Sequence, residues 1–438
     1  MTPLDAPAVA AQVPSRAAQA PSPAARLMGD LSGPYRLGWR VLRQHWPALL
    51  AIALAAQIAR DGVLEVATRV LAAHGWFWFF LVFALAPTAT MTAWVVMLRR
   101  ARSSLPGLAA TPPGALVAVI VPFVAYYQLA LAAADWQTVS GGLLSELLGR
   151  QFAGLRLAAT DFVPVTVAAA VVAVLVLLRW LSSRRVNVYP AAGIPALYVE
   201  ILLFLFLGSL TVDAFSRSQA WVEQRRVWVD AVAIYHSTFD WAGPAAGAAQ
   251  GARDWWTGAW QVVTPALVVP IFALVAGAVA LGLRPPEQPR PRHRAGNLAW
   301  ATVLALVDLL RGYLLSRIGI MLQVLRVMLR AGLVAALSFC VGFVALDVAT
   351  DWLLPLERTL IGPHDFSDFW IPVSALLARV NNAIWTLLLI CLLAGTVGHV
   401  ARRLDAAALS ASSGEQPHES GPLPVEFDAD GGRVSAGR

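Results

Sequence analysis

The first group that could do chemistry is an acid inside an apolar stretch. Residues 195–210 read PALYVEILLFLFLGSL, and Glu200 is the one charged side chain among them. Ionisable residues within membrane helices are costly, so they mark a functional site by default. Desolvation disfavours the charged form, and no cation at the same depth is evident, so Glu200 should often be protonated. This suits a proton-coupled step, or a packing residue that hydrogen-bonds Tyr198, Gln128 or Tyr127.

A second constellation combines two acids with an arginine and two amides. Asp347 and Asp351 are four residues apart and therefore share one helix face. Arg379, Asn381 and Asn382 follow in the next apolar run. Because the two runs are joined by a short outer segment, Asp347 and Arg379 should lie at matching depths and form an ion pair. The pair is either a structural pin between two helices or part of a substrate site.

The connecting loop, 362–370, reads GPHDFSDFW and adds His364, Asp365 and Asp368. This outer cluster could hold a cation or cap the helix ends. Neither the zinc-ligand spacings nor the phosphate-cradling and nucleophile motifs occur in the chain. The sequence therefore predicts no metal site, no cofactor and no assigned catalytic residue.

Composition decides which elements must position these side chains. Of 438 residues, 58% are hydrophobic and 13% are charged, against about 25% charged in ordinary soluble domains. The 33 basic residues are all arginine, which is typical of GC-rich coding, and they flank apolar runs instead of forming a nucleic-acid-binding face. We therefore expect an all-α, polytopic transmembrane helix bundle whose partner is the lipid bilayer and not nucleic acid.

A helix needs about 20 apolar residues to cross a bilayer. Arginines gather beside alternate runs, which places both termini in the cytoplasm by the positive-inside rule. The expected location is a bacterial plasma membrane, with a multi-pass topology. The eight predicted spans are 44–62, 76–98, 115–134, 161–180, 190–213, 260–283, 331–353 and 372–399.

The remaining segments complete the predicted organisation. The stretch 297–330 is apolar but carries several charges, so it is either an amphipathic interfacial helix or a ninth span. The basic, proline-rich linker could bind anionic lipid or a protein partner through Arg284, Arg290, Arg292 and Arg294, or be a plain cytoplasmic loop. The predicted units are a disordered tail (1–33), a bundle of spans one to six (34–283), the linker (284–296), the interfacial helix with spans seven and eight (297–403), and a second disordered tail (404–438).

Three functions remain open at this point. The first is a non-catalytic scaffold or accessory subunit of a membrane assembly. The second is a proton-coupled transporter or export component that uses Glu200. The third is an intramembrane enzyme acting on lipid-linked substrates at the outer face, through Asp347, Asp351, His364, Asp365 or Asp368.

Overall fold

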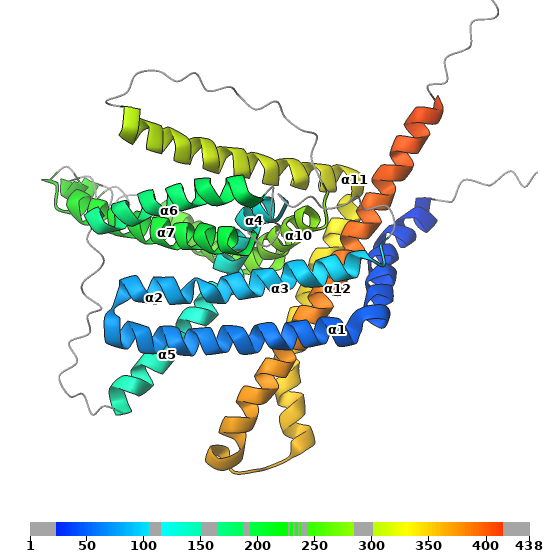
Figure 1. Cartoon of the computed structure of the whole chain (residues 1–438), viewed down its shortest axis with the longest axis horizontal. Helices are drawn as coiled ribbons and strands as arrows, with labels where there is room; N and C mark the ends of the chain where they lie inside the picture. Colours follow the sequence, from blue (N-terminus) through cyan, green and yellow to red (C-terminus); the bar gives the residue numbers. More distant parts are fainter. Residues whose placement is uncertain are drawn as a thin grey trace, which may run out of the picture.

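The computed structural model describes residues 23–105, 115–149, 165–186, 193–226, 244–283 and 301–414, and a few positions between 228 and 237. All elements in these residues are helical, which confirms the predicted all-α class. With the labels of Figure 1, they are α1 (Pro23–His74), α2 (Trp76–Phe83), α3 (Leu85–Arg102), α4 (Ala115–Ala130), α5 (Ala132–Gly149), α6 (Val165–Val186), α7 (Gly193–Glu223), α9 (Pro244–Val263), η3 (Thr264–Val268), α10 (Val269–Ala280), α11 (Ala301–Ile361), η4 (Phe366–Trp370) and α12 (Ile371–Gly414).

Within the described residues, four helices are long and apolar enough to cross a membrane. They correspond to four of the eight predicted spans, 76–98, 260–283, 331–353 and 372–399. The structure does not show the other four as spans. The four helices are Trp76–Arg102, Gln250–Ala280, Gly332–Ile361 and Phe366–Ala407.

The four predicted spans that are not shown differ from the prediction for separate reasons. The run 44–62 belongs to the long helix α1, where Arg60 and Asp61 interrupt the apolar sequence. The run 115–134 is divided by the turn between α4 and α5. The runs 161–180 and 190–213 lie partly outside the described residues, and within the described part their apolar helices are Ala170–Arg179 and Gly193–Gly208.

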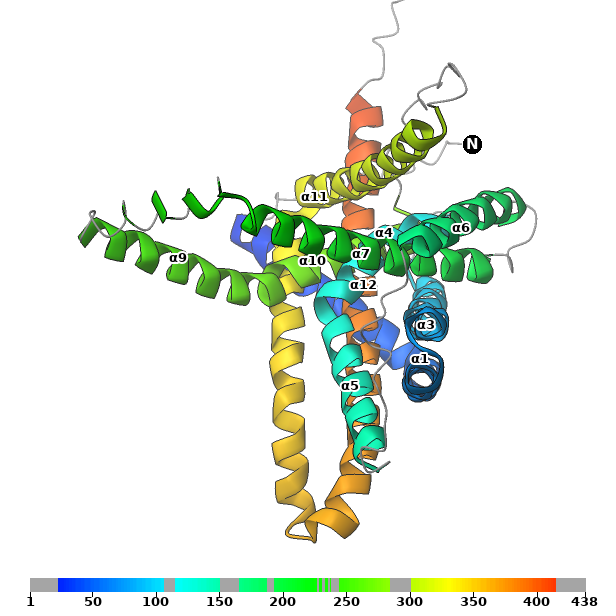
Figure 2. The same ribbon diagram turned by 90° about the vertical axis from the view of Figure 1, so that its left-hand side faces the viewer.

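The long helices run in different directions. α1 and α3 form an antiparallel pair that Figure 2 views end-on, whereas the second half of α11 and α12 form an upright hairpin. The chain reverses between α1 and α2 at Gly75, whose φ of 82° lies in the left-handed region that favours glycine. α12 crosses α1, and the two helices pack closely along their contact (Figure 1).

α11 consists of two parts that meet at a kink. At Gly332 the backbone leaves helical geometry (φ −170°, ψ 58°), and the helix changes direction there (Figure 1). The part after the kink, Gly332–Ile361, is one of the four apolar helices. This division lies close to the predicted boundary at residue 330, and the choice between an interfacial helix and a ninth span stays a prediction.

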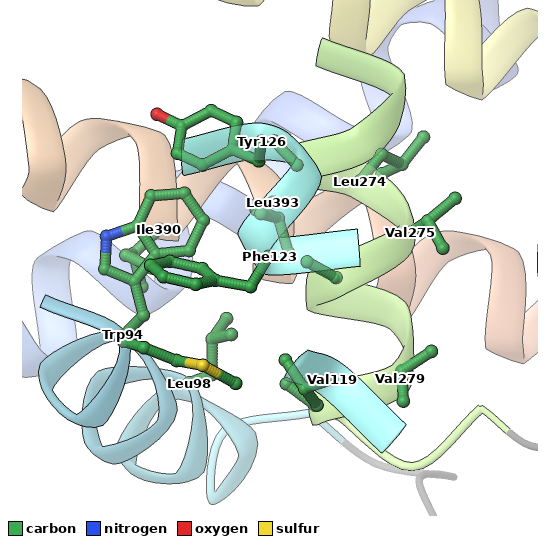
Figure 3. Packing of buried hydrophobic residues seen from close by; sticks show 14 of the residues in the cluster. Trp94, Leu98, Val119, Phe123, Tyr126, Leu274, Val275, Val279, Ile390 and Leu393 are labelled. Atoms are coloured by element: carbon green, nitrogen blue, oxygen red, sulfur yellow. The ribbon is translucent and has the colours of Figure 1, made fainter. Parts of the chain in front are cut away.

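The main core lies where α3, α4, α10 and α12 meet. Figure 3 shows Trp94 and Leu98 of α3 facing Phe123 of α4, with Leu274 of α10 and Leu393 of α12 around them. Trp94 and Phe123 pack edge to face with their ring centroids 5.6 Å apart. This core fixes the position of α4 and α10 against the α11–α12 hairpin.

Some predicted segments lie partly or wholly outside the described residues. These are 1–22, the linker with Arg284, Arg290, Arg292 and Arg294, and 415–438. Within the described part, α1 begins at Pro23 and α12 continues to Gly414, so helix extends into both predicted tails. The helices around the predicted second constellation are also longer than its spans, because α11 continues to Ile361.

Candidate functional site

A pocket of ≈ 810 Å³ opens between α4, the start of α10, and the α11–α12 hairpin. We call it the acidic pocket. Its size is within the range of small-molecule sites, about 300–1,000 Å³. Its lining residues are Tyr126, Ala130, Leu131, Pro265, Val269, Phe343, Asp347, Thr350, Asp351, Leu354, Ser374, Ala375, Ala378, Asn381, Asn382 and Trp385.

α11 supplies the two carboxylates. Phe343, Asp347, Thr350, Asp351 and Leu354 line the pocket at helical spacings of three and four residues, so they form one face, as predicted for the two aspartates. The carboxylates are exposed to the pocket opening. Asp347 lies near the middle of the apolar helix Gly332–Ile361, roughly 20 Å from each end at 1.5 Å per residue.

α12 supplies the facing wall. Ala378, Asn381, Asn382 and Trp385 lie on its pocket side, which brings the two predicted amides to the two predicted acids. The backbone carbonyl oxygen of Asn382 accepts a hydrogen bond from Thr386 Oγ1 (2.8 Å), as often occurs with threonine in a helix. The site thus offers amide donors and acceptors opposite carboxylate acceptors.

The predicted Asp347–Arg379 ion pair is wrong. Arg379 Nε donates to Asp61 Oδ2 of α1 at 2.7 Å. The reason is angular, because Arg379 follows Ala378 by one residue, or about 100° around the helix, and so turns from the pocket toward α1. The residues that line the pocket include two carboxylates and no basic side chain.

Two aromatic side chains in the pocket wall carry polar atoms without a partner among the described residues. Tyr126 is fully buried, and its hydroxyl has no hydrogen-bond partner. Figure 3 shows that this hydroxyl points away from Leu274 and Val275. Trp385 Nε1 is likewise buried and unpartnered, while its ring packs edge to face on Phe343 at 5.8 Å. An unsatisfied buried polar group costs about 1–3 kcal/mol.

The pocket also borders an irregular stretch of backbone. The π-helical turn η3 (Thr264–Val268) contains Pro265 and precedes Pro270. Proline removes a helical hydrogen bond, and single π turns inside helices occur frequently at functional sites. Pro265 and Val269 of this stretch line the pocket.

Glu200 lies elsewhere, and the expectation that it lacks a cation is wrong. Arg179 of α6 places its Nε 3.4 Å from Glu200 Oε2, and both side chains are largely buried between α6 and α7. Tyr198, a suggested partner, instead donates to the Leu81 carbonyl at 2.8 Å. Sequence depth placed Arg179 at the cytoplasmic end of its span, but α6 and α7 pair so that it reaches the acid.

Sequence reasoning missed a buried network on α1, α4 and α5. Asp135 is completely buried, and it accepts hydrogen bonds from Arg60 and from the hydroxyl of Tyr127. Arg60 and Asp61 are consecutive, so α1 is tied to α5 by one residue and to α12 by the next. The sequence signal that could have indicated this network is the pair of charged residues, Arg60 and Asp61, within the predicted span 44–62.

The outer cluster is a helix cap at the tip of the α11–α12 hairpin. Asp365 Oδ1 accepts hydrogen bonds from the Ser367 hydroxyl (2.7 Å) and from the Ser367 and Asp368 amides (2.8 and 3.0 Å). These bonds hold the pKa of the Asp365 carboxyl below its usual value. The His364 ring stacks on Phe369 with centroids 4.3 Å apart. No group of three or more His, Cys, Asp or Glu in the described chain is arranged to hold a metal ion.

Comparisons with protein-family models, with curated proteins and with solved structures find no match to this chain.

Proposed function

We propose that this chain is a multi-pass membrane protein that binds a small solute in the acidic pocket, as a transport or export component of the bacterial plasma membrane. The observation that carries the proposal is the pocket itself, in which mid-helix carboxylates meet buried donors without partners. Membrane solute sites are commonly built near the middle of spans, beside interrupted helices.

The energetic argument starts from Asp347 and Asp351. Carboxylates within an apolar helix are costly unless they face a water-filled cavity or a partner. None of the described residues that line the pocket is basic, and Arg60, which lies near enough to act on Tyr126, is paired with Asp135. A pocket that admits water and solute removes this cost and gives the residues a use.

The observed contacts of Glu200 and Asp365 bear on the transporter and enzyme alternatives. With Arg179 beside it, Glu200 acts as a link between α6 and α7, so Asp347 replaces it as the acid best placed for a transport step. The enzyme alternative could use either the aspartates or the outer cluster, and a site that combined both sets would need them close together. Asp365 is engaged in its cap, and the helix from Asp351 to Ile361 covers about 15 Å.

The test is water access to the pocket in the full chain, reconstituted in lipid nanodiscs. We expect a cysteine introduced by Ala378→Cys to react readily with N-ethylmaleimide, because a thiol needs water to form the reactive thiolate. The native Cys340 and Cys391 are buried and set the background.

The matched control is Ala345→Cys, at nearly the depth of Asp347 but outside the pocket lining. Ala345 is exposed on α11 outside the acidic pocket, where lipid would surround it. We expect it to react much more slowly than the Ala378 variant. Equal, slow reaction at both positions would mean that the pocket holds no water and would refute the proposal.

A scaffold role is the second candidate, and one feature favours it. α9 extends away from the other helices (Figure 2) and exposes Trp255, Trp256 and Trp260, each more than half accessible. Tryptophan also anchors helices at the membrane interface. Replacing the three by alanine should dissociate a partner under the scaffold hypothesis, and should change only membrane insertion if they contact lipid.

A further inference from the structure

We propose that the solute of the acidic pocket carries an organic ammonium group, which sits between the aspartates of α11 and the aromatic wall. This inference rests on the proposed solute-binding function and specifies its ligand class. It uses the pocket-lining side chains and the two unpartnered donors as independent observations.

Charge selects a cation. Asp347 and Asp351 lie one turn apart on the same face, and the lining contains no arginine, histidine or lysine to neutralise them. The nearest arginine along α12, Arg379, is engaged by Asp61. An anionic solute would meet two like charges in the pocket, whereas a cation supplies the counter-charge that the two carboxylates lack among the lining residues.

The aromatic wall selects an organic cation. Phe343, Trp385 and Tyr126 line the same pocket as the aspartates. Faces of aromatic rings attract ammonium groups within about 6 Å, and this arrangement is the usual means of recognising quaternary ammonium ligands. The Phe343 and Trp385 rings pack at 79° to each other, so they present differently oriented surfaces.

Size and donors complete the description of the ligand. A volume of ≈ 810 Å³ is far larger than a bare metal ion needs. Tyr126 Oη and Trp385 Nε1 are buried in the pocket wall and lack partners in the described chain, so an acceptor atom on the solute, or a water held with it, satisfies them once the wall opens slightly. The best match is therefore a molecule with an ammonium group and a hydrogen-bond acceptor.

An ammonium group can come from two sources, a soluble amine or the headgroup of a phospholipid. Both present the same chemistry to the aspartates and the rings. The experiment separates them by using nanodiscs of phosphatidylcholine and nanodiscs of digalactosyldiacylglycerol. Both lipids have no net charge, and only phosphatidylcholine contains an ammonium group.

The test measures protection of the Ala378→Cys variant from N-ethylmaleimide by three probes of similar size. They are benzyltrimethylammonium, the anion phenylmethanesulfonate and the neutral benzyl methyl sulfone. We expect the cation to protect at a concentration at least about tenfold lower than the other two, since one well-placed cation–π or charge contact is sufficient for a factor of that order.

Isosteric variants test the residues. Asp347→Asn and Asp351→Asn should each raise the half-protecting concentration of the cation about tenfold and leave the sulfone unchanged, whereas Asp254→Asn, an exposed acid of α9, should change neither. Weaker protection by the cation in phosphatidylcholine than in the glycolipid identifies the headgroup as the native occupant, and equal protection identifies a soluble amine.

The outcomes that overturn the inference differ from those that overturn the proposed function. If Ala378→Cys reacts readily but the three probes protect equally, or none protects, the pocket is open to water and the ammonium assignment is wrong. If Ala378→Cys reacts as slowly as Ala345→Cys, the pocket holds no water and the solute-binding function itself is wrong.

Discussion

The contact between α1 and α12 depends on glycine. A Cβ built on Gly395 would lie 2.5 Å from Gly38 N and 2.9 Å from Gly38 Cα, and it would also contact Pro34 O. These are backbone atoms, so no side-chain rotation can relieve the contact. Small residues allow helices in membranes to approach this closely. Gly395→Ala is therefore expected to separate α12 from α1.

The magnitude follows from the geometry. Close carbon–oxygen contacts between helices lie at about 3.3–3.6 Å, so the helices must move apart by roughly 1 Å to accept the methyl group. Overpacking of this kind costs about 1–3 kcal/mol, and the gain in helix propensity from glycine to alanine offsets up to about 1 kcal/mol. With the full offset of about 1 kcal/mol, the expected net effect of Gly395→Ala is a loss of up to about 2 kcal/mol, centred on about 1 kcal/mol.

The matched control is Gly62→Ala in α1. Gly62 is exposed and has no atom within 4 Å of its built Cβ, so only the propensity gain of about 0.5–1 kcal/mol applies. The two alanine variants should therefore change stability in opposite directions. The assay is the fraction of each full-length variant that remains monodisperse in detergent after heating. If Gly395→Ala matches the wild type or exceeds it, the close packing of α1 on α12 is wrong.

Three further predictions concern the ion pairs and the cap. Arg60→Met leaves the fully buried Asp135 without its cation and should reduce stability by about 3–5 kcal/mol in the same heating assay. The control, Arg69→Met, breaks an exposed pair with Glu65 and should change stability by less than about 1 kcal/mol. Similar losses in the two variants would contradict the burial of the network. A double-mutant cycle of Glu200→Gln and Arg179→Gln should give a coupling energy of about 0.5–3 kcal/mol, and additive effects would show that the two groups do not interact. The pKa of Asp365 is lowered in the folded chain, so its cap stabilises the hairpin tip at pH values above the usual pKa of 3.8 and is lost as the pH falls through the lowered pKa. Amide hydrogen exchange at Ser367 and Asp368 should therefore be faster in Asp365→Ala than in the wild type at neutral pH, and unchanged exchange would contradict the cap.

Local sequence was sufficient for features that depend on hydropathy and helical spacing. The all-α class, the four apolar helices and the shared face of Asp347 and Asp351 all follow from residues within one run. The span count exceeded what the structure shows, because α1 is continuous through Arg60 and Asp61, a turn divides the run 115–134 between α4 and α5, and the runs in α6 and α7 are only partly described.

Contacts between distant residues could not be predicted in this way. Arg379 pairs with Asp61, 318 positions away, because the crossing of α12 over α1 decides which face it presents. Matching of depth across one hairpin suggested Asp347, but it contains no information on rotation about the helix axis. Tyr126 had no sequence signal as a pocket residue for the same reason.

The sequence by itself determined where the apolar helices lie and that acids occur within them, since desolvation and helical periodicity act on neighbouring residues. Only the tertiary structure decided which acids are neutralised. Glu200 and Asp135 receive arginines from other helices, whereas Asp347 and Asp351 face a pocket lined by aromatic rings and amides and by no basic residue. Helix packing thus pairs the first two acids with arginines and leaves the aspartates of α11 facing the acidic pocket, which is the basis of the proposed binding site.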